Sequence, residues 1–228
     1  MKKLVVFTGA GISAESGIKT FRDSDGLWEE YDVMKVATPE AWEADPDLVL
    51  EFYSKRFEQV VEAKPNAGHY TIAELEKNFD VHVITQNIDD LHEKSGSTNV
   101  LHLHGEIKKV RSVLNGYCYS APSDYVKMGD VCPDGGQLRP HVVWFGENVP
   151  NLPIAEQIVA EADIFLVVGT SLNVYPAANL IYMCKERCKK YLIDPKPVKA
   201  NRIERMEFIS EKASIGLPML AERLLEKD

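Results

Sequence analysis

A short apolar run at residues 4–7 leads directly into a glycine-rich turn. The run, LVVF, is rich in β-branched and aromatic residues and predicts a buried strand. Gly9, Gly11 and Ala14 then form a G-x-G-x-x-A pattern. Such a turn bends the chain sharply, lets a pyrophosphate approach the backbone and lets the next helix aim its free N–H groups at the phosphates. Any tight strand-to-helix turn also favours glycine, so the pattern alone leaves a purely structural turn open.

The acidic residue that holds the adenosine ribose in ordinary dehydrogenases has no counterpart after this turn. Glu29 and Glu30 lie at the usual spacing of about 20 residues, but the surrounding DSDGLWEEYD predicts no strand. A polar segment with a fixed positive charge, TFRD at residues 20–23, follows the turn instead. A nucleotide-binding turn followed by an irregular loop indicates that chemistry takes place on the nucleotide itself.

Composition excludes several classes of protein. The 228 residues suffice for one domain of about 150 residues and a smaller lobe. The formal net charge of −9 disfavours a general affinity for nucleic acid or an anionic membrane, and favours cationic partners such as lysine-bearing proteins. No apolar run reaches the roughly 18 residues of a membrane span, and we expect no leader peptide. Four cysteines without a disulfide framework favour a reducing, cytoplasmic location.

Strand and helix patterns alternate along the rest of the chain. Further strands are predicted near residues 81–84, 100–103, 140–145, 164–168 and 191–193. Helical patterns cover residues 39–64, 67–77, 176–187 and 218–226, with a short helix that closes near Gly96. This alternation predicts an α/β protein with a doubly wound, Rossmann-like parallel sheet.

Small or polar residues follow five of the predicted strands. They are GAGIS at residues 9–13, TQNID at 85–89, the pair His104–Gly105, GTS at 169–171 and Asp194. Open α/β sheets bind ligands at the carboxyl ends of their strands. Turn chemistry alone does not account for five polar strand ends on one edge, so the sequence predicts a nucleotide site there.

Two segments, residues 24–64 and 109–138, fit the alternation poorly. We expect them to be two insertions that together build a small lobe over the strand-end edge, with a cleft between the lobes. The remaining residues, 1–23, 65–108 and 139–228, are then assigned to the Rossmann-like nucleotide-binding domain.

Several blocks resemble the signature motifs of the sirtuins, a family of NAD-dependent protein lysine deacylases. The blocks are GAGIS, GIKTFRD, TQNID, the HG pair, LRPHVVWFGE and GTSLNVYPA, in family order from residue 9 to about residue 178. The resemblance therefore covers most of the chain. It implies that NAD binds along the strand-end edge.

The resemblance also implies a mechanism. The acyl-lysine carbonyl oxygen attacks C1′ of the nicotinamide ribose, which releases nicotinamide and leads to free lysine and O-acyl-ADP-ribose. His104 matches the general base that acts on a ribose hydroxyl, a role suited to imidazole with its unperturbed pKa of about 6.5. Asn87 matches a second catalytic residue. From the residues alone, His104 could equally be a strand-end histidine bonded to backbone, or half of a metal site together with His102.

The resemblance also assigns cofactor contacts to individual residues of these motifs. Gln86 is expected to bond the ribose, Arg22 the diphosphate side, and Thr170 and Ser171 the adenosine side. The full set that the resemblance implies is Gly9, Ala10, Gly11, Ser13, Ala14, Thr20, Phe21, Arg22, Gln86, Asn87, Ile88, Asp89, His104, Gly169, Thr170, Ser171, Asp194 and Ala213.

The acyl-lysine peptide is expected to bind by strand addition. The VVWFGE stretch and residues 173–175 resemble the two edges that clamp such a peptide, although burial in the core is the alternative for Val142 and Val143. The substrate set is Tyr53, Arg56, Val142, Phe145, Gly146, Glu147 and Val174.

Tyr53 and Arg56 predict the acyl preference. They lie three residues apart on one helix face and match the Tyr-x-x-Arg pair of sirtuins that prefer succinyl- and malonyl-lysine. Arginine can bind a distal carboxylate through two hydrogen bonds, and the tyrosine hydroxyl can add a third. The alternative is a solvated arginine beside an amphipathic tyrosine.

The family's structural zinc site is incomplete in this chain. Two C-x-x-C pairs are usual in the second insertion, but here only Cys118 and Cys132 remain. Two thiolates leave a tetrahedral zinc two ligands short, and completion by Asp130 or Asp134 is disfavoured. We therefore predict that zinc is absent and no other metal is bound.

Three other functions compete with deacylation. They are mono-ADP-ribosyl transfer, a non-catalytic NAD or ADP-ribose sensor, and hydride transfer, which the missing ribose acid disfavours. The intact His104 and the Tyr53–Arg56 pair favour a deacylase. The sequence predicts no oligomeric state.

Overall fold

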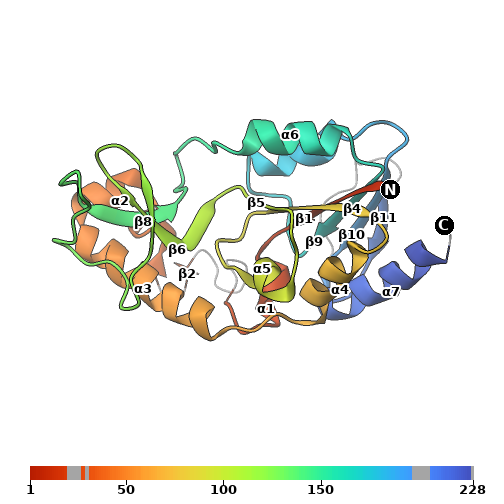
Figure 1. Ribbon diagram of the computed structural model, residues 1–228, viewed down its shortest axis with the longest axis horizontal. Coiled ribbons are helices and arrows are strands. Elements are labelled where there is room, and N and C mark those ends of the chain that lie inside the picture. Colours follow the sequence, from red (N-terminus) through yellow and green to blue (C-terminus); the bar gives the residue numbers. More distant parts are fainter. Residues whose placement is uncertain (20–26, 29–30, 197–205, 227–228) are drawn as a thin grey trace.

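The computed structural model describes residues 1–19, 27–28, 31–196 and 206–226. A parallel sheet occupies one side of the molecule, and a lobe of two helices and a small antiparallel sheet occupies the other (Figure 1). Thr20, Phe21 and Arg22, which the resemblance assigns to the cofactor, lie outside the described residues.

Among the described residues, the large sheet has six strands, all of them parallel. In spatial order they are β11 (Met206–Ile209), β10 (Lys189–Ile193), β9 (Ile164–Val168), β1 (Lys3–Thr8), β4 (Asp80–Thr85) and β5 (Val100–His102). The chain starts at the centre, builds outward through β4 and β5, and then returns to build outward from β9. This reversal between β1 and β9 is the mark of a doubly wound sheet and creates a switch point for ligand binding. The predicted fold class is confirmed.

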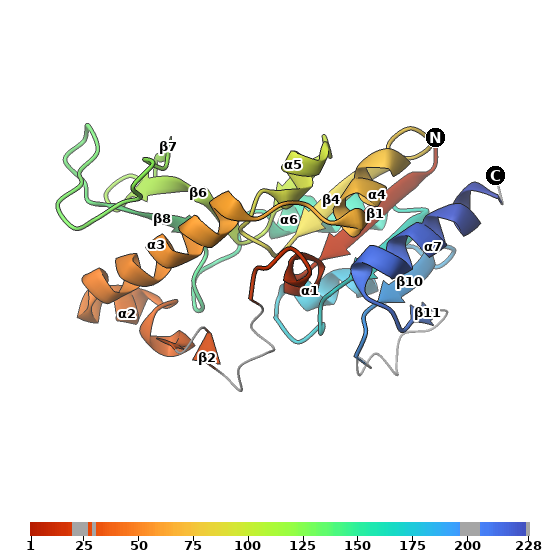
Figure 2. The same cartoon turned by 90° about the horizontal axis from the view of Figure 1, so that it is seen from below.

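Helices cover both faces of this sheet (Figures 1 and 2). On one face, α4 (Ala67–Leu75) and α7 (Ala213–Leu225) pack against side chains such as Val83 and Leu166. On the other face, α6 (Leu152–Ala160) and the 3-10 helix η3 (Ala177–Met183) pack against Phe7 and Phe165, whose rings stack at 6.3 Å. Both apolar faces of the sheet are buried, as a parallel sheet requires.

The carboxyl ends of the strands lie level with one another. Thr8 at the end of β1 is in register with Thr85 of β4 and with Val168 of β9, and Val168 is in register with Ile193 of β10. Two short helices, α1 (Ala10–Ala14) and α5 (Leu91–Ser95), begin just beyond this edge. The polar turns that follow these strands are therefore brought together.

The small lobe combines helices with two pieces of antiparallel sheet. It contains α2 (Pro39–Ala44), α3 (Pro46–Glu62), the 3-10 helix η2 (Val33–Lys35), the hairpin of β2 (Leu27–Trp28) and β3 (Tyr31–Asp32), and a sheet of β6 (Gly105–Ser112), β7 (Cys118–Ser120) and β8 (Leu138–Val142). The two predicted insertions supply most of these elements. The exact domain boundaries stay a prediction.

The strand predicted at residues 140–145 exists as β8, but it does not join the parallel sheet. It pairs antiparallel with β6, with Gly105 opposite Val142 and Ser112 opposite Leu138. The expectation of no strand in residues 23–32 is wrong, because β2 and β3 form a two-residue hairpin there. Strands β6, β7 and β11 also escaped the sequence analysis. They are short or carry charged residues at alternate positions, so their apolar signal is weak.

The single helix predicted over residues 39–64 is wrong, because the chain forms two helices that meet at Asp45. Asp45 ends α2 and then begins α3, where its side chain accepts a hydrogen bond from the Leu48 N–H at 3.0 Å. Pro46 occupies the first position of α3, where its missing N–H costs nothing. An Asp-Pro pair inside a helical pattern therefore marks the start of a new helix and not the interior of one long helix.

Two further helix predictions are corrected. Residues 176–187 form the shorter 3-10 helix η3, and Cys184 already lies beyond it in an extended conformation. The last helix begins at Ala213 rather than at Pro218, which lies inside α7. None of the helices in the described ranges combines the length and the apolar character needed to cross a membrane.

Candidate active site

A cavity of about 250 Å³ lies between the strand-end edge and the small lobe. Turns after β1, β4, β5 and β9 form one side of it, and α3 with the segment after β8 forms the other. The predicted cofactor residues in its wall are Ala10, Gly11, Ser13, Gln86, Asn87, Ile88, Asp89, His104, Gly169, Thr170 and Ser171.

The whole predicted substrate set lines the same cavity. Its members are Tyr53, Arg56, Val142, Phe145, Gly146, Glu147 and Val174. Among the described cofactor residues, Gly9, Ala14, Asp194 and Ala213 stand outside the cavity wall. Asp194 is buried at the end of β10, where its carboxylate accepts the Lys196 N–H at 2.9 Å.

The glycines of the first turn are needed for a contact within the protein. A Cβ on Gly11 would lie 2.6 Å from the Cα of Gly169, and one on Gly9 would lie 2.9 Å from the Gly169 oxygen. Gly169 itself has a φ of 62° and leaves no room for a side chain beside Ile12. The turns after β1 and β9 therefore close the switch point backbone against backbone, an approach that the local sequence pattern does not reveal.

A buried polar network fixes Asn87 and Asp89. The Asn87 side-chain amide donates to the Gly9 oxygen at 3.1 Å and to the Ser13 hydroxyl at 3.0 Å. Ser13 in turn donates to the Asp89 carboxylate at 2.9 Å. Burial raises the pKa of Asp89 above its usual range, against the opposing hydrogen bonds from Leu91 and Ser13. The network ties the turn after β4 to the turn after β1.

His104 is oriented by the backbone of a neighbouring strand end. Its Nδ1 lies 3.0 Å from the Gln86 oxygen, and because a carbonyl only accepts, Nδ1 carries the proton and Nε2 is the basic atom of the neutral ring. Burial lowers the pKa of His104, and the bond to Gln86 only partly offsets this. The imidazole is therefore neutral at pH 7.

The glycine after His104 allows β6 to start so close to β8. Gly105 has a φ of 82°, and a Cβ there would lie 2.0 Å from the His141 oxygen. The Val143 N–H donates to the His104 oxygen at 2.9 Å. The histidine is thus held at the junction of the two lobes.

His102 and His104 do not form a shared metal site. The His102 Nδ1 lies 2.9 Å from the Asn87 oxygen, and its Nε2 lies 2.8 Å from the Glu93 carboxylate, so both ring nitrogens are used. Burial alone would lower the pKa of His102, but the hydrogen bond and charge of Glu93 raise it overall. His102 therefore supports the backbone of Asn87 instead of facing the cavity.

Gln86 keeps one donor for a ligand. Its Oε1 accepts the Thr170 hydroxyl at 3.1 Å, while its buried Nε2 has no hydrogen-bond partner in the described structure. A buried amide N–H group that lacks a partner is costly unless a bound molecule supplies an acceptor. With the close-packed glycines and the hydroxyls of Thr170 and Ser171 beside it, this donor fits the hydroxyl-rich ribose of a nucleotide.

The small-lobe side of the cavity consists of long buried side chains. Tyr53, Arg56 and Val60 share one face of α3 and line the cavity, with exposed fractions of 0%, 4% and 1%. The Trp144 indole N–H donates to the Tyr53 hydroxyl at 3.1 Å. A guanidinium at this depth brings positive charge into a largely apolar wall.

The model of the Sir2 family matches residues 9–176 of this sequence. This chain belongs to the Sir2 family. The matched residues include every strand-end turn that lines the cavity, from the Gly9 turn to the loop after β9. The predicted family is confirmed.

Relatives of this Sir2-family chain match over almost its whole length. An NAD-dependent protein deacylase of Bacteroides thetaiotaomicron is 52% identical over 231 residues, covering 99% of each chain. One of Helicobacter pylori is 47% identical over 226 residues, again covering 99% of each. A solved Sir2 homologue in complex with NAD is 40% identical, with a TM-score of 0.89 over 99% of this chain and 90% of that one.

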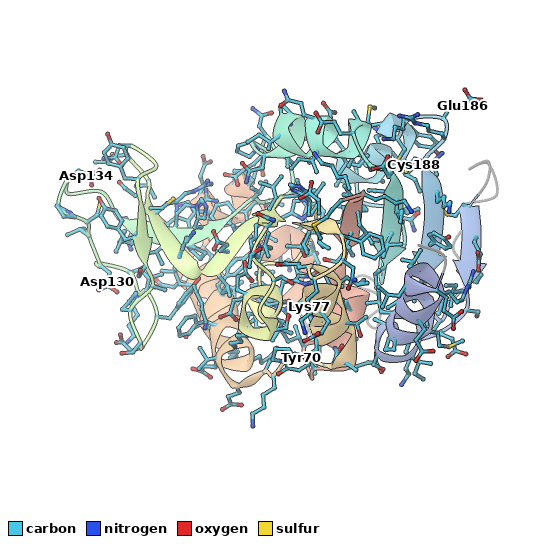
Figure 3. The ribbon with its side chains drawn as sticks, turned by 45° about the vertical axis from the view of Figure 1, so that its right-hand side comes forward. Tyr70, Lys77, Asp130, Asp134, Glu186 and Cys188 are labelled. Carbon is cyan, nitrogen blue, oxygen red and sulfur yellow. The ribbon has the colours of Figure 1, made fainter. Side chains whose placement is uncertain are left out.

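Cys118 and Cys132, at the outer end of the small lobe, hydrogen-bond to different partners. Cys118 lies 3.2 Å from the Nδ1 of His141. Cys132 instead hydrogen-bonds to Asp134, whose carboxylate also accepts the Ser112 hydroxyl at 2.9 Å and the Gly136 N–H at 2.9 Å. Asp130 and Asp134 lie on the outer loops (Figure 3). Within the described ranges, no three potential metal ligands converge.

Several cavity residues escaped the sequence analysis as site residues. They are mostly apolar or backbone-lining positions: Ile18, Lys19, Ala37, Val60, Val149 and Pro176. An apolar residue has the same sequence signal in a cavity wall as in a core. Helical spacing from Tyr53 and Arg56 could have found Val60, which lies one turn further along the same face of α3.

Proposed function

We propose that this Sir2-family chain is an NAD-dependent protein lysine deacylase that prefers acidic acyl groups such as succinyl and malonyl. The observation that supports this preference is the buried Arg56 beside Tyr53 in the cavity wall. A guanidinium that lines a cavity can bind a carboxylate there through two charge-assisted hydrogen bonds. A carboxylate at the end of an acyl chain would present such a group to Arg56.

The residues of the strand-end edge fit NAD. Gln86 Nε2 and the hydroxyls of Thr170 and Ser171 would bind ribose, and the turn at Gly9–Gly11 would lie beside the phosphates. When bound, NAD supplies the electrophilic ribose carbon that accepts the acyl oxygen. Thr20, Phe21, Arg22, Asp194 and Ala213 complete the proposed cofactor set.

His104 is the proposed general base. Its Nδ1–H is used by the Gln86 oxygen, so the Nε2 lone pair takes the proton from a ribose hydroxyl. The side-chain N–H groups of Asn87 are used by the Gly9 oxygen and the Ser13 hydroxyl. Its Oδ1 would then help to position the nicotinamide side of NAD. The buried Asp89 acts beside it in the same network.

The acyl-lysine peptide would lie between the two exposed edges of the cavity. Gly146 and Glu147 follow β8 on one side, and Val174 lies on the other. An extended peptide could add main-chain hydrogen bonds to these edges, while the acyl chain enters the cavity towards α3. Acylated cytoplasmic proteins would be the natural substrates, without nucleic acid or membrane.

The proposal includes no structural zinc. The outer loop is instead held by hydrogen bonds that the Asp134 carboxylate accepts from Ser112, Cys132 and Gly136. Metal analysis of the purified protein tests this point. One zinc per chain would contradict it.

The function is tested by mass spectrometry on matched acetyl- and succinyl-lysine peptides, with and without NAD. We expect NAD-dependent loss of succinyl to exceed loss of acetyl. A preference for acetyl would retain the deacylase and remove the role of Tyr53 and Arg56. Covalent transfer of ADP-ribose to the protein target, with no deacylation, would indicate an ADP-ribosyltransferase.

The substitution Arg56→Met tests the acyl preference directly. Charge-assisted hydrogen bonds contribute about 1.5–3 kcal/mol, so kcat/KM for succinyl-lysine should fall roughly 10- to 150-fold while deacetylation is retained. Lys55→Met is the matched control, since it removes the same charge from the adjacent, half-exposed position of α3. Equal loss of both activities in Arg56→Met would contradict a carboxylate-binding role.

A further inference from the structure

The Tyr53 hydroxyl has one hydrogen bond in the described structure, and in it the oxygen accepts. Its partner is the Trp144 indole N–H at 3.1 Å, and an indole nitrogen can only donate. The hydroxyl proton of Tyr53 is therefore left to point elsewhere. Tyr53 is 0% exposed and lines the cavity, so an acceptor for this proton has to come from the cavity itself.

Trp144 is held rigidly in the position from which it donates. Its backbone N–H donates to the Glu147 carboxylate at 2.8 Å. The guanidinium carbon of Arg139 lies 3.3 Å from the centre of its ring, and the ring of Trp42 lies 5.7 Å away. A side chain fixed through its backbone and by rings and charge around it has little freedom to re-aim its N–H.

The group that fixes Trp144 also lies at the peptide edge. The Glu147 carboxylate is bound by Arg139 at 2.9 and 3.1 Å and by Arg111 at 3.1 and 3.3 Å. Burial raises the pKa of Glu147, but the bonds from Arg139 and Trp144 outweigh it, so the carboxylate stays ionised. A continuous set of contacts therefore runs from Glu147 through Trp144 to the Tyr53 hydroxyl.

We propose that Trp144 is a positioning residue for acidic acyl groups, because it occupies the Tyr53 oxygen and so directs the Tyr53 O–H at the distal carboxylate of the substrate. This inference rests on the acyl preference proposed above. Arg56 supplies the charge, and the Trp144–Tyr53 pair supplies a directed neutral donor beside it.

Two properties of Tyr53 support the role. Burial raises its pKa far above the range in which proteins work, so the hydroxyl keeps its proton and does not repel a carboxylate. A hydroxyl that accepts a hydrogen bond also becomes a stronger donor, since bonds in a chain polarise one another. Both effects depend on the enclosed environment that Trp144 helps to form.

The test is Trp144→Phe, which removes the N–H and keeps an aromatic ring under Arg139. Loss of one neutral hydrogen bond should raise KM for a succinyl-lysine peptide and lower the succinyl-to-acetyl ratio of kcat/KM roughly two- to tenfold, with little change in kcat. Trp42→Phe is the matched control, because Trp42 packs against Trp144 but does not bond Tyr53. It should leave the ratio unchanged.

Tyr53→Phe supplies a second variant that leaves Trp144 in place. We expect Trp144→Phe to have no further effect on the ratio in the Tyr53→Phe background, since a purely structural role of Trp144 would lower the ratio in both backgrounds. Melting temperatures show whether each variant is folded.

The outcomes separate the two proposals. A ratio that falls in Arg56→Met and Tyr53→Phe but stays constant in Trp144→Phe would overturn the positioning role alone. Equal effects of Trp144→Phe and Trp42→Phe, or effects that multiply with Tyr53→Phe, would also overturn it. A ratio that Arg56→Met and Tyr53→Phe leave unchanged would overturn the acyl preference itself.

Discussion

The two sides of the cavity are built in different ways. On the strand-end side, turns meet backbone to backbone, as at Gly11 and Gly169, and short polar side chains such as Asn87 and Ser13 fill the remaining space. On the small-lobe side, long buried side chains such as Tyr53 and Arg56 project from one helix. On the first side, a Cβ added at Gly11 would meet the backbone of Gly169, whereas on the second side it is side chains that form the wall.

This difference predicts a division of labour. Residues of the strand-end side should affect every acyl substrate equally, because they act on the cofactor and on the common chemistry. Residues of the small-lobe side should change the ratio between substrates. Substitutions on each side can therefore be compared through the succinyl-to-acetyl ratio of kcat/KM.

The largest effect is expected from His104→Ala. Removing a general base lowers turnover by about 10²- to 10⁴-fold, and both acyl substrates should lose activity by the same factor. Single-turnover assays with both peptides, together with circular dichroism, measure this. A loss confined to one acyl group would break the division between the two sides.

Gly11→Ala should reduce stability and NAD affinity together. The added Cβ would lie 2.6 Å from the Gly169 Cα, and forcing an atom into a closed site costs about 1–3 kcal/mol. Thermal melting and NAD titration measure the effect. Gly17→Ala is the control, since Gly17 has a φ of 88° but no atom within 4 Å of an added Cβ. A larger drop in NAD affinity from Gly17→Ala would contradict the close-packing argument.

Activity should fall at low pH with the protonation of His104. Its pKa is lowered by burial, so the ring is neutral and active above its ordinary pKa of about 6.5, and activity is lost as the pH falls through a lower value. Each unit below that value should cost about tenfold in kcat/KM for either peptide. A midpoint of the pH profile above pH 7, or different midpoints for the succinyl- and acetyl-lysine peptides, would contradict this assignment.

Ser112→Ala should have the smallest effect, a loss of stability, because Ser112 belongs to neither side of the cavity. Ser112 is buried and bonds both Asp134 and the Leu114 N–H at 3.1 Å, so its loss should cost about 1 kcal/mol, or about 2–4 °C in Tm. Ser120→Ala on the exposed strand β7 is the control and should leave Tm unchanged. Any change in the acyl ratio from Ser112→Ala would show that the outer loop acts on the cavity.

The parallel sheet could be predicted from the sequence because its signals are local. The run before Gly9 and the polar residues at 85–89 and 169–171 each mark a strand end, and β1, β4, β5, β9 and β10 lie where the apolar patterns place them, whereas the edge strand β11 was missed. The helix predictions were less accurate where a start signal lay inside an apolar pattern. Asp45 with Pro46 splits one predicted helix, and the last helix begins five residues before Pro218.

The sequence by itself determined the fold class, the strand-end edge and the family, since these depend on residue types at fixed local spacings. Only the tertiary structure decided that Gly11 faces Gly169, that His102 turns away from His104, and that Trp144 donates to Tyr53. Trp144 and Tyr53 are 91 residues apart. Contacts between distant segments depend on how the lobes pack together, and that packing leaves no periodic pattern in the chain.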